Sequence, residues 1–117
     1  MTTTLATNGN VILKAGLNAS VLTDAQYTEL INQAECQINV ESEYNWNDAY
    51  GTLNVDVKYL LTLAASNLAA IYLINYDPNA WGLATAQTKL DVLWDGYVDA
   101  IKLLRETDKN QIFIKEA

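Results

Sequence analysis

The chain has 117 residues, with 7 basic and 14 acidic side chains and a formal net charge of −7. It has no histidine and a single cysteine, which excludes a Ser-His-Asp triad, imidazole metal ligands, an intrachain disulfide and a cysteine zinc site. An acidic chain that is poor in arginine is also a weak ligand for nucleic acid phosphates. Half of the residues are hydrophobic, enough for one small domain with a core. The composition therefore predicts a structural or interaction protein without a cofactor, and not an enzyme.

The first 22 residues are predicted to form an N-terminal arm outside the helical domain. Residues 1–10 are rich in Thr and Asn and have no apolar period, which is typical of an extended arm. The short apolar run Val11-Ile12-Leu13 follows, and we interpret it as a brief strand or an extended segment packed on the helices. The segment lacks the basic and apolar regions of a secretory signal, so we expect none.

The first helix is predicted over residues 23–42. Thr23 and Gln26 have the spacing of a capping box, and Asp24 suits the positive end of the helix dipole. Apolar side chains at helical spacing then define one buried face: Tyr27, Leu30, Ile31, Ala34 and Ile38. The polar side chains, Glu35 among them, are assigned mostly to the solvent side.

Cys36 lies in the middle of this helix, between Glu35 and Gln37. Nearby carboxylates disfavour the thiolate, so Cys36 is a poor candidate nucleophile. We interpret it as a small, partly buried residue.

Residues 43–53 are predicted to form a loop that carries Tyr44, Trp46 and Tyr50. Two interpretations remain open. The aromatic rings can fold back to cover the end of a small core. Alternatively, Tyr44 and Trp46 can contact a neighbouring chain, since Trp and Tyr are favoured interface anchors.

The second helix is predicted over residues 55–75 and is apolar on nearly all sides. Such a helix is buried on most sides, so it should be central, either between the other two helices or completed by another subunit. Tyr59 to Tyr76 carries no charge and approaches the length of a membrane span. Because polar residues interrupt this stretch and no cationic cluster flanks it, we expect a buried helix of a soluble protein and no membrane partner.

The third helix is predicted over residues 83–106, after a stop at Asp77-Pro78. Gly96 lies inside it, where glycine costs about 1 kcal/mol relative to alanine. We therefore expect close packing at Gly96 and not a break.

Asp91, Asp95 and Asp99 repeat at every fourth position and line one face of this third helix. A carboxylate metal site in a helical bundle usually adds histidine, so a solvated acidic face is the favoured interpretation. Like charges at this spacing are mildly destabilising. This cost suggests that the negative face serves an interaction with another molecule.

The last residues, 109–117, are predicted to form a short β-prone tail around Ile112, Phe113 and Ile114. This run can pair with residues 11–13 of the same chain, or it can add a strand to a partner. The sequence thus predicts an all-α protein with a three-helix core at 23–42, 55–75 and 83–106, a helical domain spanning 23–108, and extended ends.

Two segments resemble the head–tail connector, or adaptor, proteins of tailed bacteriophages. The first helix resembles theirs in the order Leu22-Thr23-Asp24-Ala25-Gln26-Tyr27, then Leu30-Ile31, Ala34-Glu35 and Ile38-Asn39. The third helix resembles their closing helix in Trp94-Asp95-Gly96-Tyr97-Val98-Asp99-Ala100-Ile101-Lys102-Leu103-Leu104-Arg105. The similarity spans residues 21–114.

The resemblance implies a non-catalytic virion protein of the neck, made in the host cytoplasm. It implies a ring, commonly of twelve copies, that binds the portal protein and the next neck or tail-completion protein. The tail would dock on the portal through Ile112, Phe113 and Ile114. DNA would pass through the ring without specific binding, and Asp91, Asp95 and Asp99 are candidates to line the bore, since an acidic bore repels DNA.

Two other functions are compatible with the sequence. A small acidic helical protein can act as an interaction or inhibitor protein that mimics nucleic acid, although 18% charged residues is unremarkable for such a mimic. A carboxylate-dependent enzyme is disfavoured because no convergent motif is present.

Overall fold

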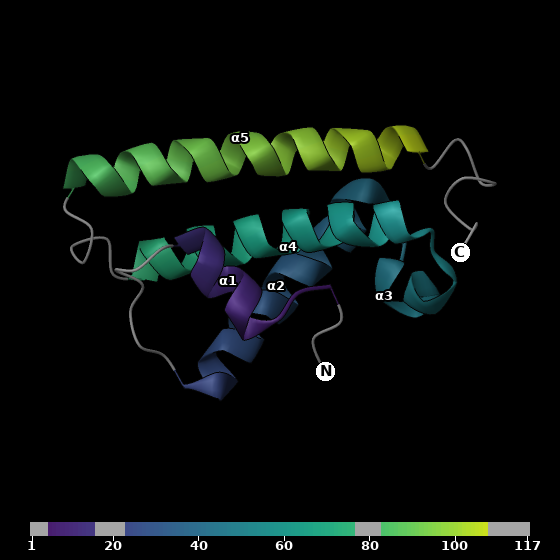
Figure 1. The fold of residues 1–117 in the computed structure, drawn as a ribbon, viewed down its shortest axis with the longest axis horizontal. Coiled ribbons are helices and arrows are strands. Elements are labelled where there is room, and N and C mark those ends of the chain that lie inside the picture. Colours follow the sequence, from purple (N-terminus) through teal and green to yellow (C-terminus); the bar gives the residue numbers. More distant parts are fainter. Residues whose placement is uncertain (1–4, 16–22, 77–82, 108–117) are drawn as a thin grey trace.

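The computed structural model describes residues 5–15, 23–76 and 83–107, and these residues form an elongated helical protein of 45 × 26 × 20 Å (Figure 1). The elements are α1 (Asn8–Ala15), α2 (Asp24–Ser42), α3 (Trp46–Ala49), a 3-10 turn η1 (Tyr50–Thr52), α4 (Val55–Tyr76) and α5 (Leu83–Thr107). The described residues contain no strand. The all-α prediction is confirmed at this level, but α1 and α3 were not expected.

The three long helices lie where their sequence patterns place them, to within one residue at each end. At the start of α2, the Thr23 side chain accepts a hydrogen bond from the Gln26 backbone at 3.2 Å, and the Gln26 side chain accepts one from the Thr23 backbone at 2.9 Å. The predicted capping box is therefore present. The helix ends at Glu43, whose left-handed backbone (φ 59°) directs its N–H to the carbonyls of Asn39 and Val40.

The prediction of an extended N-terminal arm is wrong over Asn8–Ala15, which forms α1. Thr7 and Asn10 start this helix by a reciprocal cap: the Thr7 hydroxyl accepts from the Asn10 backbone at 3.2 Å, and the Asn10 side chain accepts from the Thr7 backbone at 2.9 Å. Val11 and Ala15 are fully buried. Residues 11–13 are accordingly helical and not a strand, while the tail 109–117 lies outside the described residues.

The loop predicted over residues 43–53 is largely helical as well. Asn45 caps α3 by accepting a hydrogen bond from the Asp48 backbone at 3.2 Å, and η1 follows directly. The chain then enters α4 at Asn54, whose side chain accepts from the Asp56 backbone at 2.8 Å. Short polar caps therefore organise what the sequence pattern shows only as an irregular connection.

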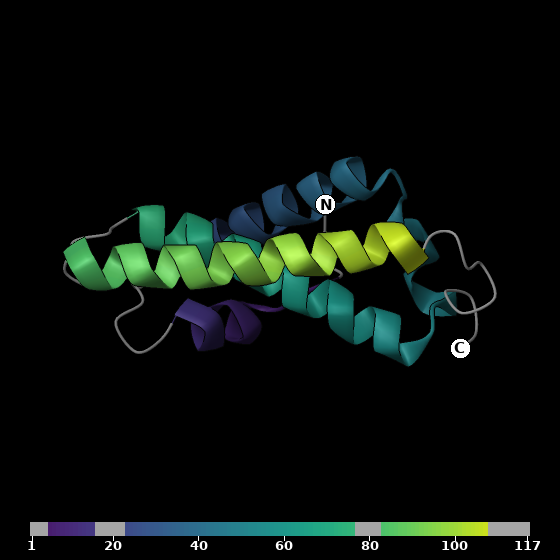
Figure 2. The same ribbon diagram turned by 90° about the horizontal axis from the view of Figure 1, so that it is seen from above.

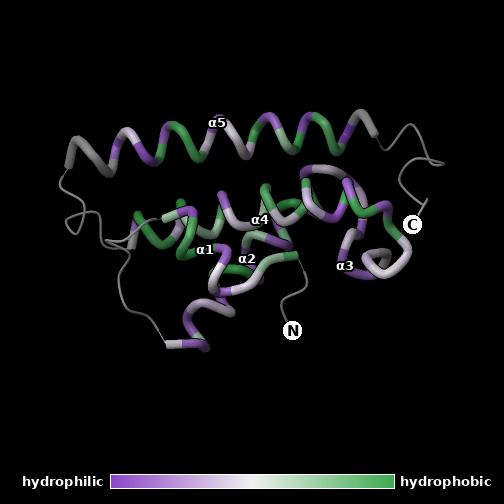
Figure 3. Tube along the Cα trace, in the orientation of Figure 1, coloured by the Kyte–Doolittle hydropathy of each residue, from purple (hydrophilic) through white to green (hydrophobic). Residues whose placement is uncertain are grey.

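Helix α4 lies at the centre and is covered on three sides by α5, α2 and α1 (Figures 1 and 2). Asn67 of α4 donates a hydrogen bond to the Leu93 carbonyl of α5, and Tyr72 of α4 donates one to Gln37 of α2. Alanines on α4 are fully buried and permit this close packing: Ala64, Ala65, Ala69 and Ala70. Along α5, in contrast, hydrophilic and hydrophobic residues alternate, as expected for a helix with one buried face (Figure 3).

One helical stretch among the described residues, Val55–Asn75, is long and apolar enough to cross a membrane by length and composition alone. Most of this stretch is buried inside the protein by the surrounding helices. The prediction that α4 is the central helix is therefore confirmed.

Gly96 lies at a close contact between α5 and α4, as its position inside the helix predicts. A Cβ atom added at Gly96 would lie 2.6 Å from the Asn67 side-chain nitrogen, shorter than any normal contact. Asn67 itself is buried and bonded to Leu93 one turn earlier on α5. A side chain at residue 96 would therefore force Asn67 out of its present position.

We expect Gly96→Ala to lower the free energy of unfolding by about 1–3 kcal/mol, because overpacking outweighs the gain in helix propensity. In an Asn67→Ala background the clash is absent, so Gly96→Ala should then be neutral or stabilising by up to about 1 kcal/mol. Urea denaturation of the four proteins measures this coupling. Gly51→Ala is the control, since a Cβ there meets no atom within 4 Å. Equal effects of Gly96→Ala in both backgrounds would contradict the contact.

Candidate functional site

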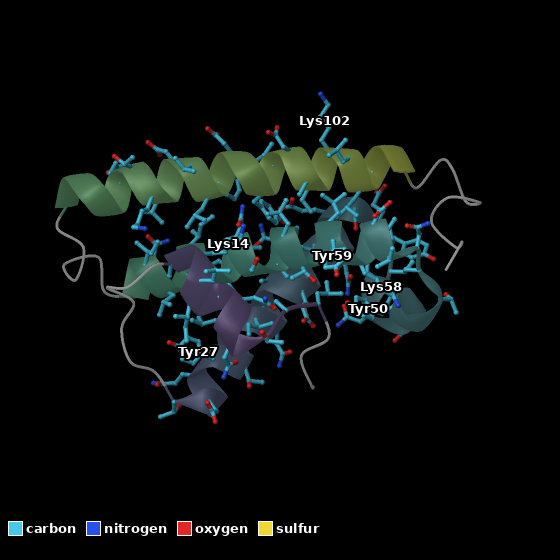
Figure 4. All side chains as sticks on the ribbon, viewed as in Figure 1. Lys14, Tyr27, Tyr50, Lys58, Tyr59 and Lys102 are labelled. Carbon is cyan, nitrogen blue, oxygen red and sulfur yellow. The ribbon has the colours of Figure 1, made fainter. Side chains whose placement is uncertain are left out.

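The outward face of α5 carries the acidic row that the sequence singles out. Asp91, Asp95 and Asp99 are all exposed, and they lie along one stripe of the helix, about 12 Å from first to last. Lys102 continues the row and projects away from the body of the protein (Figure 4). No other described helix covers this side of α5 (Figures 1 and 2). The structure thus assembles three carboxylates on one open surface.

Apolar side chains border the acidic row on both sides. Val92 and Leu103 are exposed on one border, and Trp94 and Val98 on the other. The Trp94 ring packs against that of Tyr97, with 5.4 Å between centroids, which holds it at the edge of the face. The row is therefore a defined strip of negative charge and not part of a diffuse polar surface.

The aromatic segment after α2 supports the first of its two interpretations. Trp46 is fully buried, and its indole nitrogen donates to the Ser42 hydroxyl at 2.7 Å. The half-buried Tyr44 ring lies against it, with centroids 4.4 Å apart. A side chain without exposed surface cannot contact a neighbouring chain, so the prediction of Trp46 as a partner anchor is wrong. Tyr44 is half-buried, so only part of its side chain is accessible to a neighbouring chain.

Two assignments on α2 are reversed by the structure. Cys36 is exposed and not partly buried. Glu35, placed on the solvent side by its polarity, is fully buried. Its position one turn after Ile31 and one turn before Ile38 is the signal that predicts burial, since all three lie on one face.

The buried Glu35 carboxylate joins three parts of the chain. One oxygen accepts a hydrogen bond from the Leu5 backbone at 2.8 Å, and the other accepts from the Asn47 side chain at 2.7 Å. Asn47 in turn accepts from the Asn39 side chain at 3.0 Å. A buried carboxylate is tolerated when donors satisfy it. Glu35 therefore fixes the segment before α1 and the start of α3 to α2.

A second polar cluster lies between α2, α4 and α5. Tyr72 donates to the Gln37 side chain at 2.7 Å, and Gln37 donates to Glu41 at 2.8 Å. The hydroxyl of Tyr97 is buried beside them without a hydrogen-bond partner. Burial raises the pKa of Tyr97 far above its usual value, and the charge of Glu41 raises it further; the pKa of Tyr72 is raised by the same two causes. This cluster is structural and offers no pair matched for acid–base work near neutral pH.

The described residues contain no group of three or more acidic, cysteine or histidine side chains placed to hold a metal ion. Comparison with known protein families, curated proteins and solved structures finds no match to this chain. The resemblance to phage connector proteins therefore stays a prediction, and the outward face of α5 is the candidate site that the geometry supports best.

We expect Glu35→Gln to lower the free energy of unfolding by about 1–3 kcal/mol, because an amide nitrogen would then face one of the two donors. Chemical denaturation measures the loss. Glu29→Gln is the matched control: Glu29 is exposed, and its bond from Gln33 is a surface contact, so its effect should stay within about 0.5 kcal/mol. Equal stabilities of the two variants would refute the role of Glu35.

We expect Tyr97→Phe to raise stability by about 1 kcal/mol near neutral pH, because it removes a buried hydroxyl without a partner. The raised pKa means that the folded state keeps the Tyr97 proton longer than the unfolded state, whose tyrosine pKa is 10.0. Wild-type stability should therefore fall as the pH rises above about 10, and more steeply than that of Tyr97→Phe.

The measurement is urea denaturation between about pH 8 and about pH 11. Tyr59→Phe is the control, since the Tyr59 side chain is largely exposed. Parallel pH profiles for wild type and Tyr97→Phe would show that Tyr97 is not held protonated by the fold.

Proposed function

We propose that this protein is a structural subunit of a phage head–tail connector, which forms a homo-oligomeric ring beneath the portal and lets DNA pass. The observation that carries the proposal is the exposed row Asp91, Asp95 and Asp99 on a helix face that no other described element covers. In the proposed ring, α5 faces the bore.

The physical basis is repulsion between the row and the DNA backbone. Duplex DNA carries about one negative charge per 1.7 Å of its axis, and a surface that attracts it would retain it. A strip of carboxylates about 12 Å long does the opposite, although Lys102 and Arg105 follow it toward the end of the helix. The cost of placing like charges at this spacing on a helix is then offset by a function outside the monomer.

The resemblance over residues 21–114 supports the same assignment. Two of the described helices within that span, α2 and α5, contain the two segments on which the resemblance rests. In the proposal, the tail residues Ile112, Phe113 and Ile114 contact the portal protein, and the ring also binds the next neck protein. These tail residues lie outside the described ranges. Because Trp46 is buried, contacts between subunits must use other surfaces.

Native mass spectrometry of the purified chain, alone and with the portal protein of the same virus, tests the proposal. A discrete ring, or a monomer that forms rings when the portal protein is added, is the expected result. A monomer or dimer that is indifferent to the portal would reject the connector assignment and would favour a small interaction protein.

Replacing Asp91, Asp95 and Asp99 together by Asn tests the bore assignment. We expect ring mass and portal binding to be unchanged, because the three side chains are exposed on α5. Retention of duplex DNA by the ring should rise at low ionic strength, where the screening length is about 30 Å at 0.01 M salt. Co-sedimentation of DNA with rings measures retention, and the difference should vanish at about 1 M salt. Loss of the ring itself would show that the row is structural.

A further inference from the structure

The three most exposed large apolar side chains of the described residues lie away from the acidic row, on two other sides of the molecule. Leu13 is 78% exposed, Val40 77% and Tyr59 73%. Figure 2 looks down on α5 and shows α2 along one edge, with α1 and the first half of α4 along the opposite edge. Val40 belongs to the first edge, and Leu13 and Tyr59 belong to the second.

The α2 flank is the outer side of α2, comprising Glu29, Cys36 and Val40, with Glu43 just beyond the helix. The buried residues Ile31 and Ile38 turn toward the core, and helical spacing puts the flank residues on the opposite side. All four flank residues are exposed. The α2 sequence, DAQYTELINQAECQINVES, contains no lysine or arginine. This flank is therefore acidic around one exposed valine.

The α1/α4 flank comprises Leu13 and Lys14 of α1 with Val55, Lys58 and Tyr59 of α4. Leu13 lies on the side of α1 opposite the buried Val11 and Ala15. Lys14, Lys58 and Tyr59 are labelled in Figure 4 on these two helices. Lys58 is held over the Tyr50 ring, with its nitrogen 5.2 Å from the ring centroid.

Val55 and Tyr59 lie on the side of α4 that α1 covers further along the helix. Helical spacing puts them in line with Ser66 and Leu73, which are buried further along the helix. Since Asn67 bonds α5 and Tyr72 bonds α2, this third side of α4 is the one that α1 covers. Helix α1 crosses the C-terminal half of α4, and the same side stays open over the first turns (Figure 1).

We infer that the α2 flank of one copy binds the α1/α4 flank of the next copy. Each flank has strongly exposed apolar side chains, Val40 on one and the separate Leu13 and Tyr59 on the other. The excess charges around these side chains differ in sign: Glu29 and Glu43 lie on the first flank, and Lys14 and Lys58 outnumber the exposed Asp56 on the second. Apolar side chains with complementary charges around them are the usual composition of a specific protein contact.

A contact between two different flanks repeats head to tail and closes into a ring when the rotation between copies allows it. This contact leaves the α5 face of every copy free. By the symmetry of the ring, the α5 faces of all copies then have the same orientation, which the proposal takes to be toward the bore. This inference rests on the proposed ring and adds which surfaces join its subunits. It does not require the portal or DNA, so it can fail independently of them.

Two variants test the head-to-tail contact: Val40→Glu on the α2 flank and Tyr59→Glu on the α1/α4 flank. Each should weaken self-association about tenfold or more, by placing a charge at an exposed apolar position. Neither variant should form rings alone. An equimolar mixture should form a dimer and stop there, because the intact α1/α4 flank of Val40→Glu binds the intact α2 flank of Tyr59→Glu. Native mass spectrometry, with and without portal protein, reads out these states.

Val92→Glu is the matched control, since Val92 is similarly exposed but lies on the α5 face, and its rings should be unchanged. Thermal melts establish that all variants fold. Three results would overturn the inference: wild-type chains that stay monomeric with and without portal, variants that assemble like wild type, or a mixture that does not pair. The last would indicate a contact between identical flanks.

The single cysteine gives a second measurement, because Cys36 lies on the α2 flank one turn from Val40. In a Leu13→Cys variant, a short bismaleimide should join residue 13 of one copy to Cys36 of the next and give a ladder of covalent multimers. The wild-type chain should give none; a wild-type dimer would indicate that two α2 flanks meet. Rings that cross-link in this way but do not bind portal would reject the connector and keep the contact. Portal-bound rings without the ladder would reject the contact and keep the connector.

Discussion

Burial of most of α4, on three sides of its axis, is the constraint that the rest of this fold satisfies. Leu68, Leu73 and Ile74 have almost no exposed surface, and they point in different directions around the helix. A single neighbouring helix covers only one side of such an element. Three neighbours are needed: α5 and α2 cover two sides, and the short α1 covers part of the third. Glu35 supports this arrangement, since its hydrogen bonds from Leu5 and Asn47 attach the segment before α1 and the start of α3 to α2. A buried charge thus orders the short elements around an apolar helix.

Sequence reasoning finds the long helices because caps and apolar periods agree there. Thr23 with Gln26 marks the start of α2, and apolar residues on nearly all sides of α4 mark its central place. It misses α1 because the cap Thr7–Asn10 lies in a Thr- and Asn-rich stretch that has the composition of a flexible arm. The polarity of Glu35 conceals its burial, although its helical position indicates it. Burial of Trp46 depends on Ser42 and on the helix α3, so no local pattern could distinguish it from an interface residue.

The acidic row is predicted from spacing alone, but its exposure and the absence of a covering helix follow only from the fold. What separates the outward face of α5 from the two flanks is the arrangement of three helices around α4 (Figure 2). The row occupies one side, and the three most exposed large apolar side chains, Leu13, Val40 and Tyr59, occupy two others. In the proposed ring these three sides have different tasks, repulsion of DNA on one and association with neighbours on the other two. The charge of −7 is accordingly not uniform over the surface, since α2 and the outer face of α5 hold much of it.

The contact between Gly96 and Asn67 influences the axial position of α5 relative to α4. A slide of one turn, about 5.4 Å, would bring Val92 or Ala100 opposite Asn67, where a Cβ like the one tested at residue 96 would force the Asn67 side chain to move. The lack of a side chain at Gly96 therefore favours the present axial position of α5 relative to α4. The Gly96–Asn67 contact thereby also sets the position of the three aspartates along the molecule relative to both flanks. In a ring, every copy would present its carboxylates at the same level, so that the charges form a closed band of constant height around the axis.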